Sequence, residues 1–226
     1  MSLGNGVGKI CYKKRGRYIH NMTNILTKQL SNFFSLNDQE VKFIEQFYKL
    51  IEKETTETLN NADNKYIRLG GVDPLYTNAY TIFLYKFSRF CYEKYFIELA
   101  TKIYYLNKIM NSVELFYEVE LPKYFYLDHP LGSVMGRAKY GEYFMFSQGC
   151  TVGENKGVYP KMGDFVIMYS NSKIIGASTI GNNCIISANT YIKDTVVPDN
   201  TVVFQNNREL IFKENKLNNR VKWLLE

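Results

Sequence analysis

Residues 162–197, MGDFVIMYSNSKIIGASTIGNNCIISANTYIKDTVV, carry a large apolar side chain at every sixth position. These positions are Met162, Met168, Ile174, Ile180, Ile186 and Ile192. Four residues after each stands a small or β-branched residue: Val166, Ser172, Ser178, Cys184, Thr190 and Val196. A period of six fits neither an α-helix nor a simple strand. It predicts a chain that winds around a triangular prism, the hexapeptide form of a parallel β-helix.

The same spacing extends towards the N-terminus and is interrupted once. Tyr140, Phe146 and Val152 follow one another at intervals of six, but Met162 comes ten residues after Val152. This places a four-residue insertion near 154–160, which must leave the prism as a loop, and such loops commonly carry function. The repeat fades after residue 198, and a short helix is expected at 217–225.

The N-terminal half shows helical patterns instead. Residues 38–58 have apolar side chains at a spacing of three and four, with Asp38 as the expected cap. Residues 77–117 are helical and rich in aromatic residues, with one break inside. We therefore expect an α+β protein with three parts: a helical domain with a basic arm at 1–118, a β-helix at 119–205 and a tail or helix at 206–226.

Composition excludes several classes of protein. The chain has 226 residues, 46% of them hydrophobic and 22% charged, with a net charge of +6. That charge suits an anionic ligand, but the Lys and Arg residues are scattered, so nucleic-acid binding is discounted. The four cysteines form no CxxC pair, and no metal site is expected. The sequence shows no signal peptide and no long apolar run, which favours a cytoplasmic protein without membrane association.

Only two histidines are available for acid–base chemistry. His20 lies in the basic arm, whereas His129 stands in Leu127-Asp128-His129-Pro130, where the repeats begin. A histidine next to an aspartate is either a structural residue or a general base. Its place beside a coil with an inserted loop favours the general base.

The motifs resemble those of the serine O-acetyltransferase family, hexapeptide-repeat acyltransferases with a left-handed β-helix. The family has a helical N-terminal domain, a V-D-x-H-P type segment, an L-D-H-x-x-G segment and a later H-P-K-I loop. The corresponding stretches here are Val113-Glu114-Leu115, Leu127-Asp128-His129-Pro130-Leu131-Gly132 and Tyr159-Pro160-Lys161-Met162. The likeness runs from about residue 85 to residue 201.

This resemblance implies roles for individual residues. His129 would be the general base that removes the proton of the acceptor hydroxyl, and Glu114 would orient its imidazole. Asp128 would help to hold the amino group of the acceptor. Asp73, in an Asp-Pro pair like one near the end of the family's helical domain, is either a further acceptor ligand or a helix cap.

One departure from the family bears on the acceptor. Tyr159 stands where the family has a second histidine, preceded by an arginine, that binds the serine carboxylate. Lys156 or Lys161 is a nearby cation that could replace this pair. A site without its charge partner discriminates less for the charged group. Serine and a sugar hydroxyl therefore both remain candidates.

The family also implies a cofactor groove and an assembly. The pantetheine arm of acetyl-CoA would lie between prism faces at Gly176, Ala177, Ser187 and Ala188, unless these residues are small only because corners need small residues. A homotrimer or a dimer of trimers is expected, with the site between neighbouring subunits.

The sequence thus predicts an acetyl-CoA-dependent O-acetyltransferase resembling the cysteine-biosynthesis enzyme that acetylates serine. The acetyl group would pass directly to a small-molecule hydroxyl. Two alternatives stay open. One is an O-acetyltransferase of a sugar in capsule or lipopolysaccharide biosynthesis, and the other is a non-catalytic β-helix scaffold. The residues Glu114, Asp128 and His129 favour an enzyme, because a scaffold needs no such group.

Overall fold

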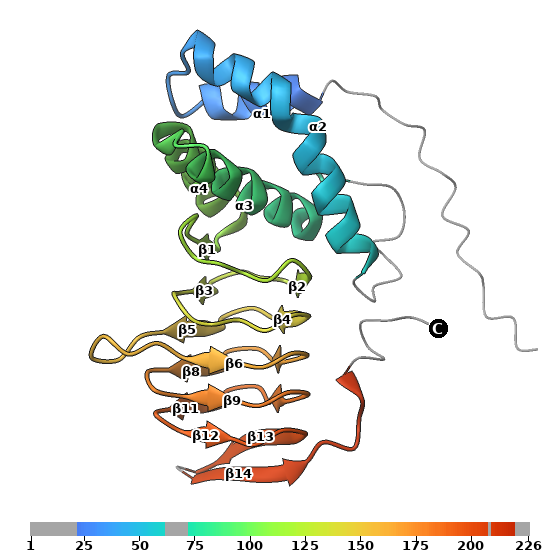
Figure 1. The fold of residues 1–226 in the computed structure, drawn as a ribbon, viewed down its shortest axis with the longest axis vertical. Coiled ribbons are helices and arrows are strands. Elements are labelled where there is room, and N and C mark those ends of the chain that lie inside the picture. Colours follow the sequence, from blue (N-terminus) through green and yellow to red (C-terminus); the bar gives the residue numbers. More distant parts are fainter. Residues whose placement is uncertain (1–21, 62–71, 208, 220–226) are drawn as a thin grey trace, which may run out of the picture.

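The computed structural model describes residues 22–61, 72–207 and 209–219. A bundle of helices stands at one end of a stack of parallel coils (Figure 1). The helices are α1 (Met22–Ser31), α2 (Asp38–Asn60), α3 (Thr77–Glu93) and α4 (Ile97–Asn111). The predicted basic arm at 1–21 and most of the expected helix at 217–225 lie outside the described residues.

The coils contain fourteen short strands in the described part of the chain. They are β1 (Glu114–Leu115), β2 (Phe125–Leu127), β3 (Val134–Met135), β4 (Phe144–Phe146), β5 (Thr151–Gly153), β6 (Lys161–Met162), β7 (Ile167–Met168), β8 (Lys173–Ile175), β9 (Thr179–Ile180), β10 (Ile185–Ile186), β11 (Tyr191–Lys193), β12 (Val196–Val197), β13 (Thr201–Asn206) and β14 (Glu209–Glu214). The predicted class, a helical domain before a left-handed parallel β-helix, is confirmed.

Helix α2 matches its predicted position, but its cap differs from the prediction. Asn37, not Asp38, is the N-cap: its side chain accepts a hydrogen bond from the Glu40 N–H at 2.9 Å. Glu40 in turn accepts from the Asn37 N–H, which completes a capping box. Asp38 is already inside the helix, where its negative charge favours the N-terminal turn.

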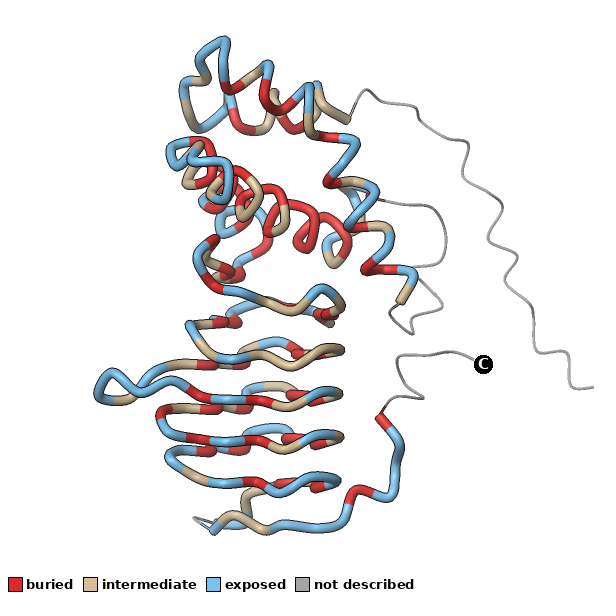
Figure 2. The backbone as a smooth tube through the Cα atoms, viewed as in Figure 1, coloured by how far each residue is buried: buried red, intermediate tan, exposed pale blue. Residues whose placement is uncertain are grey.

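Helix α3 forms the centre of the helical domain. Most of its residues are buried, which Figure 2 shows as a nearly continuous red coil. Its buried aromatic side chains include Tyr80, Phe83 and Phe87, which pack against α2 and α4. The expected break in the 77–117 pattern falls at residues 94–96, where Tyr95 takes a positive φ of 61°.

Three parallel sheets form the faces of the prism. Their strand orders are β1-β3-β5-β8-β11, β14-β13-β10-β7-β4-β2 and β12-β9-β6. In the pairings of β6 with β9, β7 with β10 and β8 with β11 the coils align with a step of 18 residues, as for Met162 and Ile180. All six large residues of the repeat are buried, with at most 3% of their surface exposed. The prism interior is therefore the dry core that the period of six predicts.

The last corner departs from the expected register by one residue. Ile180 pairs with Val197, a step of 17 instead of 18. Val197 is consequently buried, whereas Val196, the expected corner residue, is 71% exposed. A slip by one residue turns a side chain to the opposite face of its strand, so the prediction for Val196 was wrong.

The corners of the prism use left-handed backbone. Three columns of residues have positive φ: Tyr143, Phe165, Asn183 and Asn200; Gly132, Gly149, Asn171 and Asn189; Gly176 and Asp194. Glycine, asparagine and aspartate tolerate this conformation best, which explains their frequency here. At Gly149 a Cβ atom would also lie 2.1 Å from Oδ1 of Asn171, so a larger residue would have to displace that side chain.

The C-terminal segment closes the far end of the prism. β14, which the sequence did not suggest, pairs antiparallel with β13. The chain then turns back along the first corner column (Figure 1). There the amide of Asn215 donates to the carbonyl of Asn183, and that of Asn219 donates to the carbonyl of Phe165, both at 2.9 Å. These buried amides satisfy corner carbonyls and fix the segment.

None of the helices among the described residues is both long enough and apolar enough to cross a membrane.

Candidate active site

His129 lies in an insertion at one corner of the prism. Leu127 pairs with Phe146 before the corner, and Val134 pairs with Thr151 after it. Between these two pairs the first coil takes seven residue steps, whereas the second coil takes five. The two extra residues form a bulge where the other coils have a tight turn. Within it His129 has a φ of 48°, a conformation that is uncommon for residues other than glycine.

Backbone hydrogen bonds hold the bulge to its neighbours. The Asp128 N–H donates to the Phe146 carbonyl at 2.9 Å, and the Gly149 N–H donates to the Leu131 carbonyl at 2.9 Å. Within the bulge, the Leu131 N–H donates to the His129 carbonyl at 2.7 Å. The imidazole is 79% exposed, and its Nε2 lies 3.7 Å from Oδ1 of Asp128. The backbone of His129 is therefore fixed while its ring stays open to a ligand.

Glu114 lies on a chain segment that runs beside this corner. Its N–H donates to the Ser133 carbonyl at 2.9 Å, so β1 lies next to the stretch that follows the bulge. Its carboxylate pairs with Lys108 Nζ of α4 at 2.6 Å, and both side chains are about two-fifths exposed. The described contacts of Glu114 and His129 do not include one between the two side chains.

Asp73 belongs to the turn that leads into α3. Its carboxylate accepts a hydrogen bond from the Leu75 N–H at 2.8 Å, and its carbonyl accepts from the Tyr76 N–H at 2.9 Å. Asp73 therefore stabilises a turn and is not the helix cap, since the N-cap of α3 is Tyr76. Its carboxylate is exposed.

Tyr76, at the end of this turn, meets the segment that carries Asp128. Burial raises the pKa of the Tyr76 hydroxyl, a hydrogen bond with Tyr126 lowers it, and the charge of Asp128 raises it. The Asn78 amide donates to the Tyr126 hydroxyl at 3.0 Å. The structure thus brings the turn of Asp73 to Asp128 and His129, although these residues are 55 or more apart in sequence.

Sequence reasoning missed Tyr76, Asn78 and Tyr126. They belong to no periodic pattern that would indicate a functional role. A tyrosine in an aromatic-rich segment is predicted to be a buried core residue. Only the contact between α3 and β2, in which Asn78 hydrogen-bonds to Tyr126, shows that these residues lie beside the candidate site.

The expected four-residue insertion is a small β-hairpin. Asn155 and Val158 exchange two backbone hydrogen bonds around Lys156 and Gly157, both of which have positive φ. This is the two-residue turn typical of hairpins. The Asn155 amide donates to Asp194 Oδ2 at 3.0 Å and ties the loop to the next coil.

Tyr159 and Lys161 follow the tip of the hairpin. Tyr159 is 42% exposed, and Lys161 begins β6 with its side chain exposed. They stand at a different edge of the prism from His129, because the hairpin connects β5 to β6 whereas the bulge connects β2 to β3.

The four expected groove residues lie at two separate corners. Gly176 and Ala177 connect β8 to β9, beside the hairpin, whereas Ser187 and Ala188 connect β10 to β11 at the corner of His129. A Cβ atom on Gly176 would lie 2.2 Å from Oδ1 of Asp194, so packing alone requires glycine there. Within one subunit the four residues do not form a single groove.

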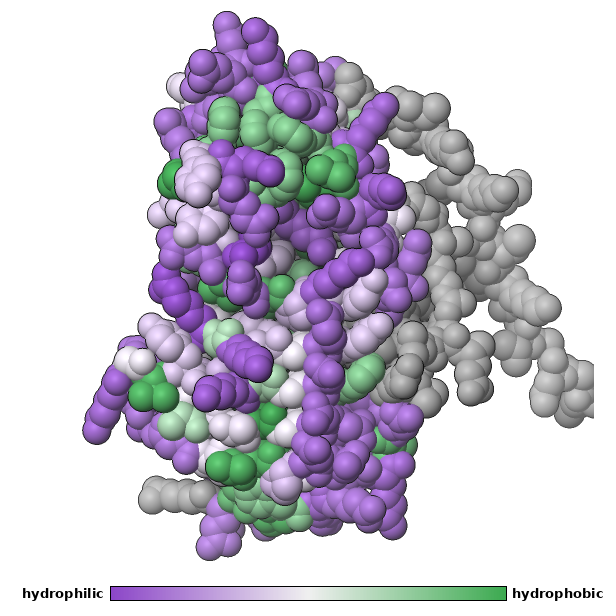
Figure 3. All heavy atoms as spheres, viewed as in Figure 1, coloured by the Kyte–Doolittle hydropathy of each residue, from purple (hydrophilic) through white to green (hydrophobic). Residues whose placement is uncertain are grey.

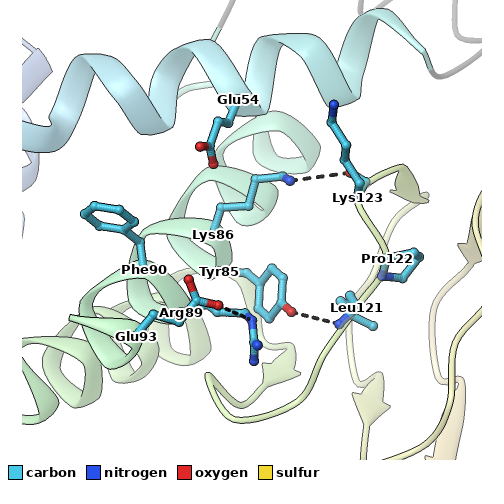
Figure 4. A pocket seen from close by; sticks show the side chains of 9 residues that line it. All are labelled: Glu54, Tyr85, Lys86, Arg89, Phe90, Glu93, Leu121, Pro122 and Lys123. Atoms are coloured by element: carbon cyan, nitrogen blue, oxygen red, sulfur yellow. Dashed lines mark hydrogen bonds and ion pairs between the residues drawn. The ribbon is translucent and has the colours of Figure 1, made fainter. Parts of the chain in front are cut away.

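Two hollows among the described residues lie away from this corner. One of about 310 Å³ lies between α2, α3 and residues 121–123 (Figure 4). There Tyr85 hydrogen-bonds to the Leu121 N–H, and Lys86 points at the Lys123 carbonyl. Burial lowers the pKa of Lys86. These side chains join the helical domain to the coils, which makes the hollow a structural junction.

The buried cysteines offer no nucleophile. Cys150 and Cys184 have no exposed surface, and burial raises the pKa of each thiol. A thiol with a raised pKa is a weak nucleophile near neutral pH.

Known proteins with this arrangement were found by sequence and by structure. No family model matches the chain. A serine acetyltransferase of Bacillus pumilus is 24% identical over 177 residues, which cover 76% of this chain and 81% of the relative. One of Staphylococcus xylosus is 26% identical over 133 residues, covering 57% of this chain and 62% of the relative. The match to the second relative therefore spans less than two thirds of its length.

Solved structures agree with the fold. A serine acetyltransferase of Vibrio cholerae superposes with a TM-score of 0.70 at 18% identity, over 91% of this chain and 83% of that one. A serine acetyltransferase in complex with CoA superposes with a TM-score of 0.63 at 18% identity, over 84% and 83% of the two chains. At this identity the superpositions show the fold.

The coils and the helical domain place the chain in the class of hexapeptide-repeat, left-handed β-helix proteins. The sequence matches narrow the class to acyltransferases. Within it, the predicted resemblance to the serine O-acetyltransferase family is confirmed.

Proposed function

We propose that the protein is an acetyl-CoA-dependent O-acetyltransferase in which His129 acts as the general base. One observation carries this proposal: the exposed imidazole stands in a two-residue bulge at a corner of a β-helix whose relatives are acyltransferases. Every other corner of that column is a tight turn of glycine or asparagine. The repeat is thus interrupted at the residue that can carry a proton.

The chemistry needs one proton carrier and one nucleophile. His129 accepts the proton of the acceptor hydroxyl while the oxygen attacks the carbonyl carbon of the thioester. The tetrahedral intermediate breaks its C–S bond, and the leaving thiolate takes the proton back from the imidazolium. The products are the O-acetyl ester and free CoA. A positioned base contributes about 10²–10⁴-fold to such a step.

Three carboxylates assist in this proposal. Glu114, whose carboxylate pairs with Lys108 in this structure, is proposed to stabilise the imidazolium. Asp128 and Asp73 provide negative charge for an ammonium group of the acceptor. What supports a shared role is Tyr76, which hydrogen-bonds to the Asp73 carbonyl through its N–H and lies within electrostatic range of Asp128.

Acetyl-CoA is the proposed acyl donor. A solved relative of the same fold is a complex with CoA. Gly176 and Ala177 stand at one corner and Ser187 and Ala188 at another, so one groove would need corners from two neighbouring subunits. We therefore propose a homotrimer, or a dimer of trimers, acting in the cytoplasm. Figure 3 shows apolar side chains interspersed with polar ones on one face of the lower coils.

The acceptor is a small molecule with a hydroxyl group, and serine is the first candidate because the relatives are serine acetyltransferases. A sugar is the second, because Tyr159 offers no charge for a carboxylate. Lys161, exposed on the adjacent strand, is the cation that would serve serine.

Release of free thiol from acetyl-CoA tests the proposal. The protein is assayed with L-serine, with serine methyl ester, and with amino sugars and nucleotide sugars. Release with L-serine but not its ester identifies a serine enzyme, and release with a sugar identifies the glycan-modifying alternative. Absence of both release and CoA binding would contradict the proposal and favour a scaffold.

A further inference from the structure

The first corner column changes in character along the stack of coils. Asn183 and Asn200 occupy its corners far from the helical domain, whereas Tyr143 and Phe165 occupy those nearer to it. The rings of Tyr143 and Phe165 stack with centroids 4.7 Å apart and planes 4° from parallel, and Tyr124 extends the stack at 5.4 Å from Tyr143. All three rings are only partly buried. This part of the column is therefore a row of aromatic rings at the surface, here called the aromatic corner.

The backbone conformation does not favour aromatic residues at these positions. Tyr143 and Phe165 have φ angles of 60° and 59°. A bulky residue is unfavourable in left-handed backbone, whereas the asparagines of the other corners tolerate it. The contacts that the two rings make must therefore outweigh this cost.

A described segment of the chain already runs along the same column. The Asn215 amide donates to the Asn183 carbonyl, and the Asn219 amide donates to the Phe165 carbonyl, both at 2.9 Å. Asn183 and Phe165 are 18 residues apart, which is one coil. Four residues of the segment thus advance by one coil towards the helical domain.

One further step of this register brings Trp223 to Tyr143. Tyr143 is the corner one coil beyond Phe165, because β4 pairs with β7. The helix expected at 217–225 gives the same result, since residues four apart share one face of a helix. Four helical residues rise by about 6 Å, close to the spacing of about 4.8 Å between paired strands. Trp223 is thereby expected on the same face as Asn219, whose side chain is fully buried at the column.

The charges of the tail suit the residues beside the aromatic corner. Glu142 and Asp164 each directly precede an aromatic residue of the column, and their carboxylates accept backbone N–H groups at 3.1 and 2.9 Å. Among the described residues, neither carboxylate is part of an ion pair with lysine or arginine. Arg220 and Lys222 flank the expected inner face of the tail, so one of them faces this acidic row.

We propose that residues 220–226 bind along the aromatic corner, with the Trp223 indole packed against the ring of Tyr143. The occupant is the chain's own tail, which continues the contacts of Asn215 and Asn219. The tail then ties the last coil to the second coil, and it covers the aromatic corner. This inference does not depend on the proposed transferase activity.

Tryptophan fluorescence of the full-length protein tests the contact, because Trp223 is the only tryptophan of the chain. Acrylamide quenching of its emission is measured in the native protein and in urea. We expect the native protein to show a severalfold lower quenching constant and an emission maximum shifted to the blue. Native quenching as strong as that of the unfolded chain would overturn the proposal without any variant.

Variants of Tyr143 locate the contact. Tyr143→Asn introduces the residue of the other corners, which suits the positive φ, and should raise the quenching constant severalfold. Tyr143→Phe keeps the ring and should match the wild type. Tyr95→Asn is the matched control: Tyr95 also has a positive φ, of 61°, but is 90% exposed in the helical domain, so quenching should not change. Unchanged quenching in Tyr143→Asn would refute the proposal.

Co-expression distinguishes the chain's own tail from the tail of a second copy. Tyr143→Asn chains are produced together with Trp223→Phe chains, so the only tryptophan belongs to chains whose own corner lacks the ring. Strong quenching in this mixture supports the proposal. Renewed protection would mean that the tail binds the aromatic corner of a neighbouring copy, and would overturn the contact within one chain.

Discussion

The corner that carries His129 and the same corner one coil further on differ in length but belong to one column. On the second coil Gly149 completes the turn with five residue steps between paired strands, and Asn171 and Asn189 repeat it below. On the first coil two more residues are accommodated, and one of them is an exposed histidine. The regular corners secure the fold, whereas the irregular one provides a reactive group.

The largest expected effect is on catalysis at the irregular corner. We expect His129→Ala to lower kcat/KM by about 10²–10⁴-fold, because it removes the general base. The melting temperature should barely change, since the side chain is 79% exposed. His129→Gly, which suits the positive φ, is the paired variant: it should be equally inactive and no less stable. Full activity in either variant would contradict the assignment of the base.

The next largest effect is on stability in a regular coil. Ile174 is fully buried in the prism interior. Ile174→Ala should cost about 2–5 kcal/mol of unfolding free energy, through lost transfer free energy and the remaining cavity. Chemical denaturation measures this cost. A cost below about 1 kcal/mol would mean that the interior is not the tight core described here.

A smaller effect is expected where the helical domain joins the coils. The Tyr85 hydroxyl donates to the Val119 carbonyl at 2.7 Å and accepts from the Leu121 N–H at 3.0 Å. Tyr85→Phe leaves both backbone groups without this partner and should cost about 1–3 kcal/mol at pH 7.

The same residue gives a pH dependence. Burial raises the pKa of Tyr85 to about 12, above its ordinary value of 10.0. The stability from the neutral hydroxyl is thus fully present below pH 10 and is lost as the pH rises from 10 to 12. Unfolding measured over this range should show a shallower decline in Tyr85→Phe than in the wild type. Parallel declines would argue against the burial of this hydroxyl.

The smallest effect concerns the left-handed conformation of the regular corner. Asn171 has a φ of 62° and an exposed side chain. Asn171→Ala should be about 1 kcal/mol less stable than Asn171→Gly, because a Cβ atom is unfavourable there while both variants lose the amide. Urea denaturation of the two variants, compared directly, measures the difference. Equal stabilities would show that backbone strain does not select the corner residues.

Periodicity made the coils predictable. The buried positions from Met162 to Ile192 follow directly from a spacing that only a prism satisfies. The slip at Val196 and Val197 could not be foreseen, because both are valines and either suits the interior. Likewise Asn37 and Asp38 are both good caps, and only the reciprocal bond with Glu40 decides between them.

The candidate site was predictable in two ways. The hairpin stands out because the period fails there, whereas His129 stands out as one of only two histidines, next to an aspartate in a segment that resembles a family motif. Tyr76 and Tyr126 do not, because their meeting depends on how α3 is placed on the first coil. A contact between distant segments leaves no signal in the local sequence.

The hairpin of β13 and β14 also determines what the far end of the protein presents to other molecules. A stack of parallel coils has, at its last turn, a row of backbone donors and acceptors that could template further strands and grow into a filament. Here an antiparallel strand occupies that row, and its exposed residues include Glu209, Lys213 and Glu214. Charged edges of this kind discourage strand addition. One of the three faces of the solenoid is thus closed by its own last strand.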